Sequence, residues 1–124
     1  MSVELSLTLP WPPRSLSPNH RAHWAAKAKA AKAYRSQCGL LTLAEYQKAK
    51  KNGLRIDPGR PVMLHLLFVP PHRRAYDVDN LVAHIKNGID GMADGLGVND
   101  RMFRLFRVVL EKELGGMVKV EIRQ

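Results

Sequence analysis

The chain has 124 residues, of which 45% are hydrophobic and 25% are charged. This length fits one domain over residues 1–124, and the composition excludes a wholly disordered protein. Lys and Arg number 20 against 11 Asp and Glu, which gives a net charge of +9 at pH 7. Such a basic chain favours a polyanionic partner, with nucleic acid ahead of an anionic membrane surface.

Cysteine usage and the N-terminus indicate the cellular compartment. Cys38 is the single cysteine, so the sequence excludes a secreted scaffold held by internal disulfides and favours a reducing cytoplasm. Residues 1–6 carry no basic segment followed by a long apolar run, so we expect no signal peptide. No apolar stretch approaches the roughly 20 residues that a membrane-spanning helix needs. We therefore expect a cytoplasmic protein with no membrane partner.

The first half of the chain predicts a strand followed by a basic helical region. Val3–Leu9 alternates apolar and polar residues, as a half-buried strand does, and Pro10–Pro13 ends it because proline cannot donate to a sheet. Ala22–Lys51 is rich in Ala, Lys, Leu and Gln, which favour helix, and Asn19 is its expected N-cap. A break near Cys38–Gly39 would give two helices instead of one, and the sequence leaves both alternatives open.

The middle of the chain predicts a buried strand, a basic loop and a second helix. Val62–Val69 is a nearly continuous apolar run between prolines, which is typical of a strand buried on both faces. After the loop at 70–76, the spacing of apolar residues predicts a helix over Val78–Ala93. Asp94–Gly97 is expected to form a turn because it contains two glycines.

The last part of the chain predicts two more strands. Met102–Leu110 and Met117–Ile122 have strand character, and Gly115–Gly116 between them suggests a hairpin. The expected fold class is therefore α+β, a single domain with a mixed sheet of about four strands and two or three helices.

The charges are distributed unevenly. Residues 20–60 carry a net charge of +8, whereas residues 61–100 carry −2 and hold five of the six aspartates. Carboxylates repel phosphate, so a protein that only coats nucleic acid gains nothing from gathering them. A protein that holds a divalent cation against a phosphodiester does gain from it. The alternative is that these aspartates cap helices and form turns.

The sharpest local pattern is Asp77–Asn80, between the predicted buried strand and the second helix. In an extended backbone, residues two apart point the same way, so Asp77 and Asp79 could converge on one ion. Mg²⁺ takes oxygen ligands and needs few carboxylates besides water and phosphate oxygens. Asp79 is alternatively the N-cap of the helix that follows.

Neighbouring residues strengthen the metal interpretation. Lys86 lies two helical turns beyond Asp79 and could neutralise a phosphate oxygen, although a solvated helix face is the commoner role of such a lysine. Asp100 starts the next predicted strand and could supply a third carboxylate, or be a turn residue. Arg73 and Arg74 precede the motif and are suited to phosphate contacts.

In this order, the motifs resemble the RusA family of crossover-junction endodeoxyribonucleases, bacterial Holliday-junction resolvases often encoded in prophages. The resemblance extends over most of the chain, with residues 21–60 similar in character more than in sequence. The matching positions are Leu9–Pro13, Asn19, Asp77–Leu81, Lys86, Asp90 and Asn99–Asp100.

The resemblance implies a RusA-like fold and a homodimeric nuclease that uses Mg²⁺ to cut four-way DNA junctions symmetrically in recombination and repair. By position, Asp77, Asp79 and Asp100 would be catalytic carboxylates that hold the metal. The family's functional lysine falls at Ala83 in this chain, and a three-residue insertion would move that role to Lys86 as a further catalytic residue.

The expected DNA contacts come from basic residues in the first helical region, the segment before it and the loop after the buried strand: Arg14, Arg21, Lys27, Lys29, Lys32, Arg73 and Arg74. Trp11 could stack on a base, but packing over the end of the sheet is its commoner role. Two other functions remain open from sequence. One is a non-catalytic phage module that binds nucleic acid, and the other is a metal nuclease that acts on other branched DNA.

Overall fold

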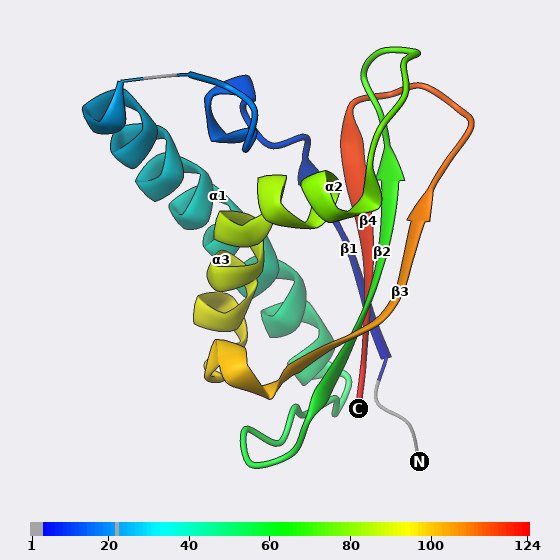
Figure 1. Cartoon of the computed structure of the whole chain (residues 1–124). Coiled ribbons are helices and arrows are strands. Elements are labelled where there is room, and N and C mark those ends of the chain that lie inside the picture. Colours follow the sequence, from blue (N-terminus) through cyan, green and yellow to red (C-terminus); the bar gives the residue numbers. More distant parts are fainter. Residues whose placement is uncertain (1–3, 22) are drawn as a thin grey trace.

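Four strands form one mixed sheet, and the helices lie on one of its faces (Figure 1). The structure, a computed structural model, describes residues 4–21 and 23–124. The strand order is β1-β4-β2-β3, in which β4 is antiparallel to β1 and β2, and β2 is parallel to the edge strand β3. The elements in chain order are β1 (Glu4–Pro10), the 3-10 turn η1 (Arg14–Leu16), α1 (Trp24–Lys51), β2 (Val62–Val69), α2 (Val78–His84), α3 (Lys86–Leu96), the 3-10 turn η2 (Asp100–Met102), β3 (Phe103–Leu110) and β4 (Met117–Arg123).

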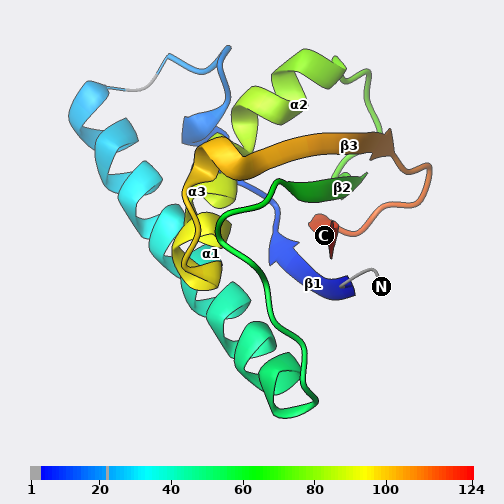
Figure 2. The ribbon, with the colours of Figure 1, turned by 90° about the horizontal axis from the view of Figure 1, so that it is seen from below.

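The core lies between the sheet and the layer of α1 and α3. In β1, Leu5, Leu7 and Leu9 are buried while the residues between them are exposed, and β4 repeats this alternation. The central strand β2 has the predicted bounds and is buried almost throughout, because β4 and β3 flank it. No helix covers the other face of the sheet within the described residues, as the two views of the ribbon show (Figures 1 and 2). Val3, the predicted start of the first strand, lies outside the described residues.

α1 is one uninterrupted helix of 28 residues, so the two-helix alternative does not occur. Its N-cap is His23, whose Nδ1 accepts a hydrogen bond from the backbone N–H of Ala25 at 3.2 Å. The prediction of Asn19 as N-cap is wrong because the chain first makes a turn, closed by a bond from His20 N to Ser17 O. The buried residues of α1 recur every four positions along a narrow stripe: Tyr34, Cys38, Thr42 and Tyr46.

The helix predicted over Val78–Ala93 is in fact two helices, α2 and α3, because the chain bends at Ile85. Ile85 has φ −92° and ψ 1°, which lie outside the α-helical region. His84 donates from Nε2 to the carbonyl oxygen of Pro13 at 2.7 Å and so holds the end of α2 on the segment after β1. α3 instead runs alongside α1, and the two short helices therefore take different directions (Figure 1).

α3 packs on α1 so closely that the two backbones touch. A Cβ at Gly91 would collide with the carbonyl oxygen of Arg35, and a Cβ at Gly95 would lie 2.6 Å from the α1 backbone. These glycines serve close packing rather than a turn, so the turn predicted over Asp94–Gly97 is wrong except at its last residue. Gly97 ends the helix with φ +72°, a conformation that favours glycine.

β3 and β4 do not form the predicted hairpin, since β4 inserts between β1 and β2 while β3 pairs with the other side of β2. Gly115 and Gly116 donate instead to the segment that ends β2, with bonds to Pro70 O and Val69 O of 2.9 Å each. The prediction that Asp100 starts a strand is also wrong, because Asp100 opens the 3-10 turn η2 that precedes β3.

The predicted class is confirmed: the described part of the chain, residues 4–21 and 23–124, folds as a small α+β domain with three α-helices and a mixed four-stranded sheet. The long helix α1 carries lysines along its length. Within residues 4–21 and 23–124, no helix has the length and apolar character needed to cross a membrane.

Candidate functional site

The five aspartates of the 61–100 window fall into two groups. Asp77 and Asp79 stand at the start of α2, where the loop after β2 enters the helix, and Asp77 lines a cavity of about 650 Å³. Asp90 and Asp94 on α3, with Asp100 in η2, line another cavity of about 320 Å³. The structure therefore brings Asp100 together with the α3 aspartates, and Asp77 lies at a different cavity.

Asp77 and Asp79 are both exposed, and neither carboxylate makes a hydrogen bond or an ion pair with the described residues. Asp77 holds the N-cap position of α2, which the sequence assigned to Asp79, but its side chain makes no capping bond. The expectation that both lie in extended backbone is wrong, since Asp77 has φ −88° and ψ 133° whereas Asp79 belongs to the first helical turn. Two carboxylates without partners thus stand at the entry of α2, next to the larger cavity.

Lys86 lies inside the second group of aspartates. Its Nζ is 2.6 Å from Asp90 Oδ1 and 3.3 Å from Asp100 Oδ2, so one ammonium group bridges two carboxylates. The hydrogen bond from Lys86 is the main cause that lowers the pKa of Asp100 below its ordinary value. The bond to Asp90 is the main cause that raises the pKa of Lys86. The bend at Ile85 removes the straight helix on which Lys86 was expected to face Asp79.

Asp94 is neutralised by a residue from α1. Arg35 donates from Nε to Asp94 Oδ2 at 2.8 Å and from a terminal nitrogen to Oδ1 at 3.0 Å, a two-bond pair between planar groups. The hydrogen bond from Arg35 holds the pKa of Asp94 below its ordinary value. The second group therefore has three carboxylates paired with two cations, Lys86 and Arg35.

The aspartates do not meet as a ready-made metal cluster. Within residues 4–21 and 23–124, no three His, Cys, Asp or Glu side chains are grouped so that they could hold a metal ion together. Asp77 and Asp79 offer free oxygen atoms, which are the ligands Mg²⁺ prefers, while Asp100 is engaged with Lys86. A cation at the start of α2 would use these two carboxylates and complete its shell with water or substrate oxygens.

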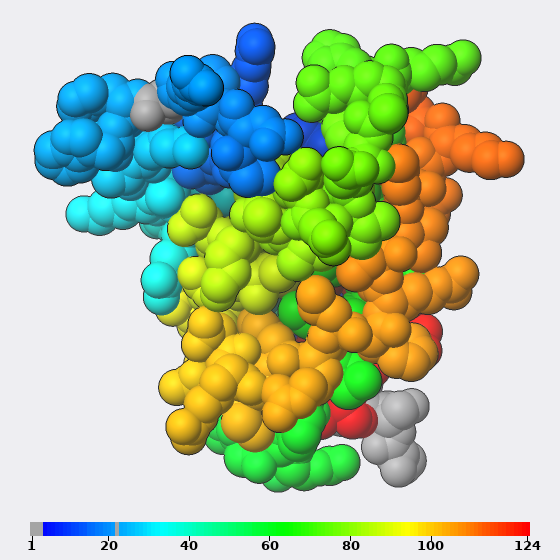
Figure 3. Space-filling model, viewed as in Figure 1, coloured from blue at the N-terminus to red at the C-terminus, as the bar shows by residue number. Residues whose placement is uncertain are grey.

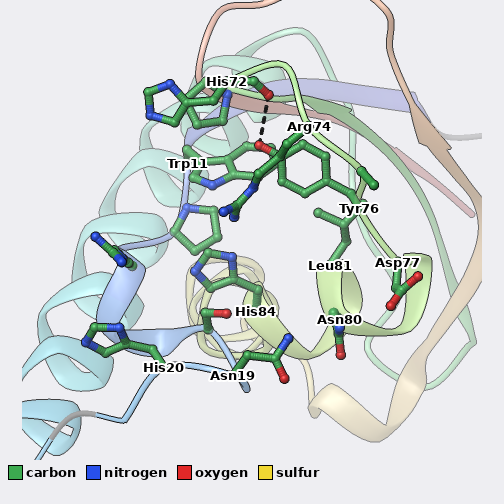
Figure 4. A pocket seen from close by; sticks show the side chains of 15 residues that line it. Trp11, Asn19, His20, His72, Arg74, Tyr76, Asp77, Asn80, Leu81 and His84 are labelled. Atoms are coloured by element: carbon green, nitrogen blue, oxygen red, sulfur yellow. Dashed lines mark hydrogen bonds between the residues drawn. The ribbon is translucent and has the colours of Figure 1, made fainter.

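The larger cavity is built from three segments that are distant in sequence (Figure 4). Trp11, Asn19 and His20 come from the segment between β1 and α1. Arg74 and Asp77, with Tyr76 between them in sequence, come from the loop after β2, and α2 completes the wall. The side chains that α2 contributes are Asn80, Leu81 and His84.

An aromatic cluster forms the inner wall of this cavity. Trp11 contacts Phe68, Tyr76 and His84 with ring planes at 68–82°, the edge-to-face arrangement that aromatic rings favour. Trp11 is only partly buried and packs against the core at the end of the sheet, as the commoner of its two predicted roles requires. The guanidinium of Arg74 lies 4.9 Å from the centre of the Tyr76 ring and covers it.

His84 is neutral at the base of the cavity. Burial is the main cause that lowers its pKa below the ordinary value, and the nearby Arg74 lowers the pKa further, against the effect of the Pro13 hydrogen bond. Because the carbonyl oxygen of Pro13 can only accept, the proton resides on Nε2. Nδ1 of His84 is then an acceptor, and it makes no hydrogen bond within the described residues.

Basic side chains surround the same end of the molecule. Figure 1 places the start of α1 and the loop after β2 at one end, and Figure 3 shows a notch between the segment before α1 and that loop. Arg14 and Arg74 line the cavity itself, and Arg73 is exposed beside it. The other predicted DNA contacts belong to the segment before α1 and its opening turns: exposed Arg21, Lys29 and Lys32 and half-buried Lys27.

Sequence reasoning missed three residues that shape the two groups. Tyr76 and His84 were not singled out, although both lie close to the Asp77–Asn80 motif and carry rings suited to a binding wall. Arg35 was counted only as part of a basic segment, and its pairing with Asp94 needs the α1–α3 contact, which has no local signal. Cys38 is buried, and its pKa is raised to about 11, mainly by that burial, so it is not a nucleophile.

Comparison with known proteins identifies a relative of this chain but does not assign it to a family. No family model matches the chain. A protein of Xylella fastidiosa (strain Temecula1 / ATCC 700964), described as an uncharacterized protein, is 41% identical to this chain over 98 residues. The match covers 79% of this chain and 61% of that protein, so the chain spans less than two thirds of its relative.

Proposed function

We propose that the chain is a Mg²⁺-dependent endodeoxyribonuclease of the RusA type. It resolves four-way DNA junctions by paired phosphodiester hydrolysis in recombination and repair. The observation that supports this most is the free carboxylate of Asp77 in a cavity that Arg14 and Arg74 also line, next to the basic start of α1. A carboxylate for a cation and guanidinium groups for phosphate are the two things such a reaction needs in one place.

The donor chemistry at the start of α2 suits Mg²⁺, which prefers oxygen ligands. Asp77 and Asp79 would hold it, since both carboxylates are exposed and without partners in the described residues. When bound there, Mg²⁺ lowers the pKa of a water ligand and stabilises charge on the phosphoryl group. Asp100, the third acid of the proposal, is held by Lys86 in the structure and would have to exchange that partner to join the other two.

The basic residues bind and orient the DNA in this proposal. Arg14 and Arg74 donate to phosphate oxygens at the cavity, and Arg73 and the α1 lysines contact phosphates farther along the junction arms. Lys86 places positive charge beside Asp90 and Asp100 and is the candidate for neutralising a leaving oxygen.

The proposal includes a homodimer, because a two-fold junction needs two cuts related by symmetry. Support comes from apolar side chains that are exposed on the edge strand β3, such as Leu105 at 46% and Phe106 at 54%. An edge strand with exposed apolar residues is a surface that proteins usually cover. We further place the protein in the bacterial cytoplasm and propose that it is prophage-encoded.

A second function is a non-catalytic module that binds nucleic acid. It is favoured by the lack of a three-acid metal group in residues 4–21 and 23–124 and by the ion pairs that occupy Asp94 and Asp100. In this alternative the basic surface is the functional part, and Asp77 only begins α2. A third alternative keeps the nuclease but changes its substrate to another branched DNA.

One substrate panel separates the three. A labelled four-way junction, a flap and a linear duplex are each incubated with the protein in Mg²⁺ or in EDTA. Paired nicks confined to the junction and dependent on Mg²⁺ support the resolvase. Binding without any cut supports the module, and cutting of the flap at the rate of the junction supports a less selective nuclease.

A further inference from the structure

The larger cavity has more features than phosphate binding requires. Its volume of about 650 Å³ lies within the range of about 300–1,000 Å³ typical of small-molecule sites. Besides Asp77 and the two arginines, it presents an aromatic wall and two amide side chains, Asn19 and Asn80. A site that only bound a phosphodiester would need cations and backbone donors, but neither an aromatic wall nor amide side chains.

The wall offers a surface on which a flat ring can stack. Arg74 covers one face of Tyr76, and Trp11 stands edge-on to Tyr76 at 5.8 Å between ring centres. Aromatic rings and guanidinium planes are the groups on which proteins stack unpaired bases. The outward side of Arg74 and the exposed part of Trp11 are therefore platforms for a base.

Polar groups in the same cavity can read the edge of a base. Neither Asn19 nor Asn80 uses its side-chain amide in a hydrogen bond with the described residues, and each can donate and accept. His84 adds an acceptor at Nδ1, because its Nε2 proton is engaged with Pro13. In Figure 4 Asn19, His84 and Asn80 lie on the same side of Trp11, Arg74 and Tyr76, so donors and acceptors are both present beside the stacking platform, as the mixed pattern at a base edge requires.

The walls are held in place before any ligand binds. The hydroxyl of Tyr34 donates to Pro10 O at 2.6 Å, so α1 fixes the residue before Trp11. The Tyr76 hydroxyl donates to His72 O at 3.0 Å and ties down the loop after β2 (Figure 4). Together with the bond from His84 to Pro13, these contacts pre-organise the cavity, which lowers the entropy cost of binding.

We infer that this cavity binds one unpaired nucleobase of a DNA strand, stacked against the Arg74–Tyr76 pair and Trp11 and contacted by Asn19 and Asn80. The neighbouring phosphate then lies near Arg14 and Arg74, where it would meet a cation held by Asp77, so the cavity selects where the strand is placed for cutting. This inference deepens the proposed function and rests on it for the role of Asp77. The binding of a base can nevertheless be measured without any cleavage.

The test uses two duplexes that differ by one base. One carries a single-nucleotide bulge, and the other carries an abasic residue at the same bulge, so both have the same phosphates. Their dissociation constants are measured by fluorescence anisotropy in EDTA. We expect the wild-type protein to bind the bulged base about 10-fold more tightly than the abasic bulge, as one stacked base is worth.

Variants show whether the cavity is responsible. Tyr76→Leu and Asn80→Ala should each bring the two dissociation constants close together, and two variants are used because Tyr76 also anchors its loop. Arg73→Ala is the matched control: Arg73 is exposed in the same loop but does not line the cavity. It should weaken both complexes equally and leave their ratio unchanged.

The possible results of this binding experiment separate the base site from its alternatives. Equal binding of the two duplexes by the wild-type protein, or a preference that survives both cavity variants, overturns the inference. If a free deoxynucleoside monophosphate binds as tightly as the bulged duplex, the ligand is a mononucleotide. That result overturns the inference that the cavity binds a base within a DNA strand. Base-dependent binding with no cleavage of any branched DNA in Mg²⁺ leaves the base site standing and overturns the nuclease.

Discussion

Asp77 and Asp94 are carboxylates that both face solvent, but their surroundings are opposite. Asp94 is held by two hydrogen bonds from Arg35, and its pKa is lowered by them. Asp77 is exposed, lines a large cavity and has no partner among the described residues. A carboxylate that is already paired stabilises the fold, whereas an unpaired one beside arginines is available to a ligand.

The same contrast divides the whole acidic window. Lys86 and Arg35 pair with Asp90, Asp94 and Asp100 and form an ion-pair network between α1, α3 and η2, which we call the paired side; Asp77, Asp79 and the larger cavity form the cavity side. The carboxylates of the window that have no ion-pair partner among the described residues are therefore Asp77 and Asp79.

Forcing α3 away from α1 should dismantle the paired side. Gly91→Val places a side chain against the carbonyl oxygen of Arg35, which belongs to the α1 backbone and cannot move aside. We expect the free energy of unfolding to fall by at least about 3 kcal/mol in urea denaturation. Ala83→Val is the control, since Ala83 is exposed in α2 and should cost only a few tenths of a kcal/mol. Similar losses in both variants would contradict the packing argument.

Removal of the Lys86 ammonium group should leave the carboxylates of the paired side without a counter-charge, as Asp77 and Asp79 are, and so available to a metal ion. In an Asp77→Asn background, Lys86→Met leaves Asp90 and Asp100 without the ammonium group that they share. We expect affinity for Mn²⁺ to rise at least about 10-fold, because two neighbouring carboxylates then lack a counter-charge. The measurement is isothermal titration calorimetry. Lys48→Met, which removes an exposed pair with Glu45, is the control and should change nothing.

The cavity side should respond to mild acid through His84. Its pKa is lowered in the folded state, so below the ordinary value of 6.5 the unfolded chain binds a proton more readily than the folded protein. Stability should therefore be full above pH 6.5 and decline as the pH falls below it. His84→Gln keeps a donor for Pro13 and cannot titrate, so its melting temperature should be flat over this range. Parallel declines in both proteins would contradict the assignment.

The paired side should respond only to stronger acid, and weakly. The lowered pKa of Asp94 means that its stabilising effect is present above the ordinary carboxyl pKa of 3.8 and is lost as the pH falls below it. Because Asp94 and Arg35 are about half exposed, water and salt screen their attraction. Arg35→Gln should shift the melting temperature at pH 7 by no more than about 3 °C. A much larger shift would show that the pair is a main support of the α1–α3 contact.

The sequence predicted best what depends on local patterns. The alternation in β1, the apolar run Val62–Val69 and the helix-forming composition before Lys51 each correspond to an observed element with nearly the predicted bounds. These patterns record directly which side chains are buried. The α+β class follows from them, so it too could be predicted.

The predictions that were wrong concern features that depend on contacts between segments distant in the sequence. Gly95 looked like a turn residue because nothing local shows that α1 lies against it. Gly115–Gly116 looked like a hairpin because pairing of β4 with β1 and β2 is a long-range property. The bend at Ile85 likewise follows the hydrogen bond from His84 to the carbonyl oxygen of Pro13, which lies 71 positions earlier in the sequence.

The sequence predicted which types of residue the candidate site contains, but only in part which of these residues lie together. Asp77 and Arg74 do line one cavity, and Lys86 does meet Asp100. The sequence could not show that these two pairs lie at different cavities, because that separation depends on the bend at Ile85, which sets the direction of α3. Nor could it show the cavity wall, which joins Trp11 to Tyr76 across most of the chain.

The central claim is that the free carboxylate, and not the paired one, serves the reaction. The most direct test is the rate of Mg²⁺-dependent cleavage of a labelled four-way junction by the wild-type protein, Asp77→Asn and Asp94→Asn. We predict that Asp77→Asn loses at least about 100-fold in rate while binding the junction normally in EDTA, and that Asp94→Asn stays within about 2-fold of wild type. Cleavage by Asp77→Asn at the wild-type rate would contradict the claim.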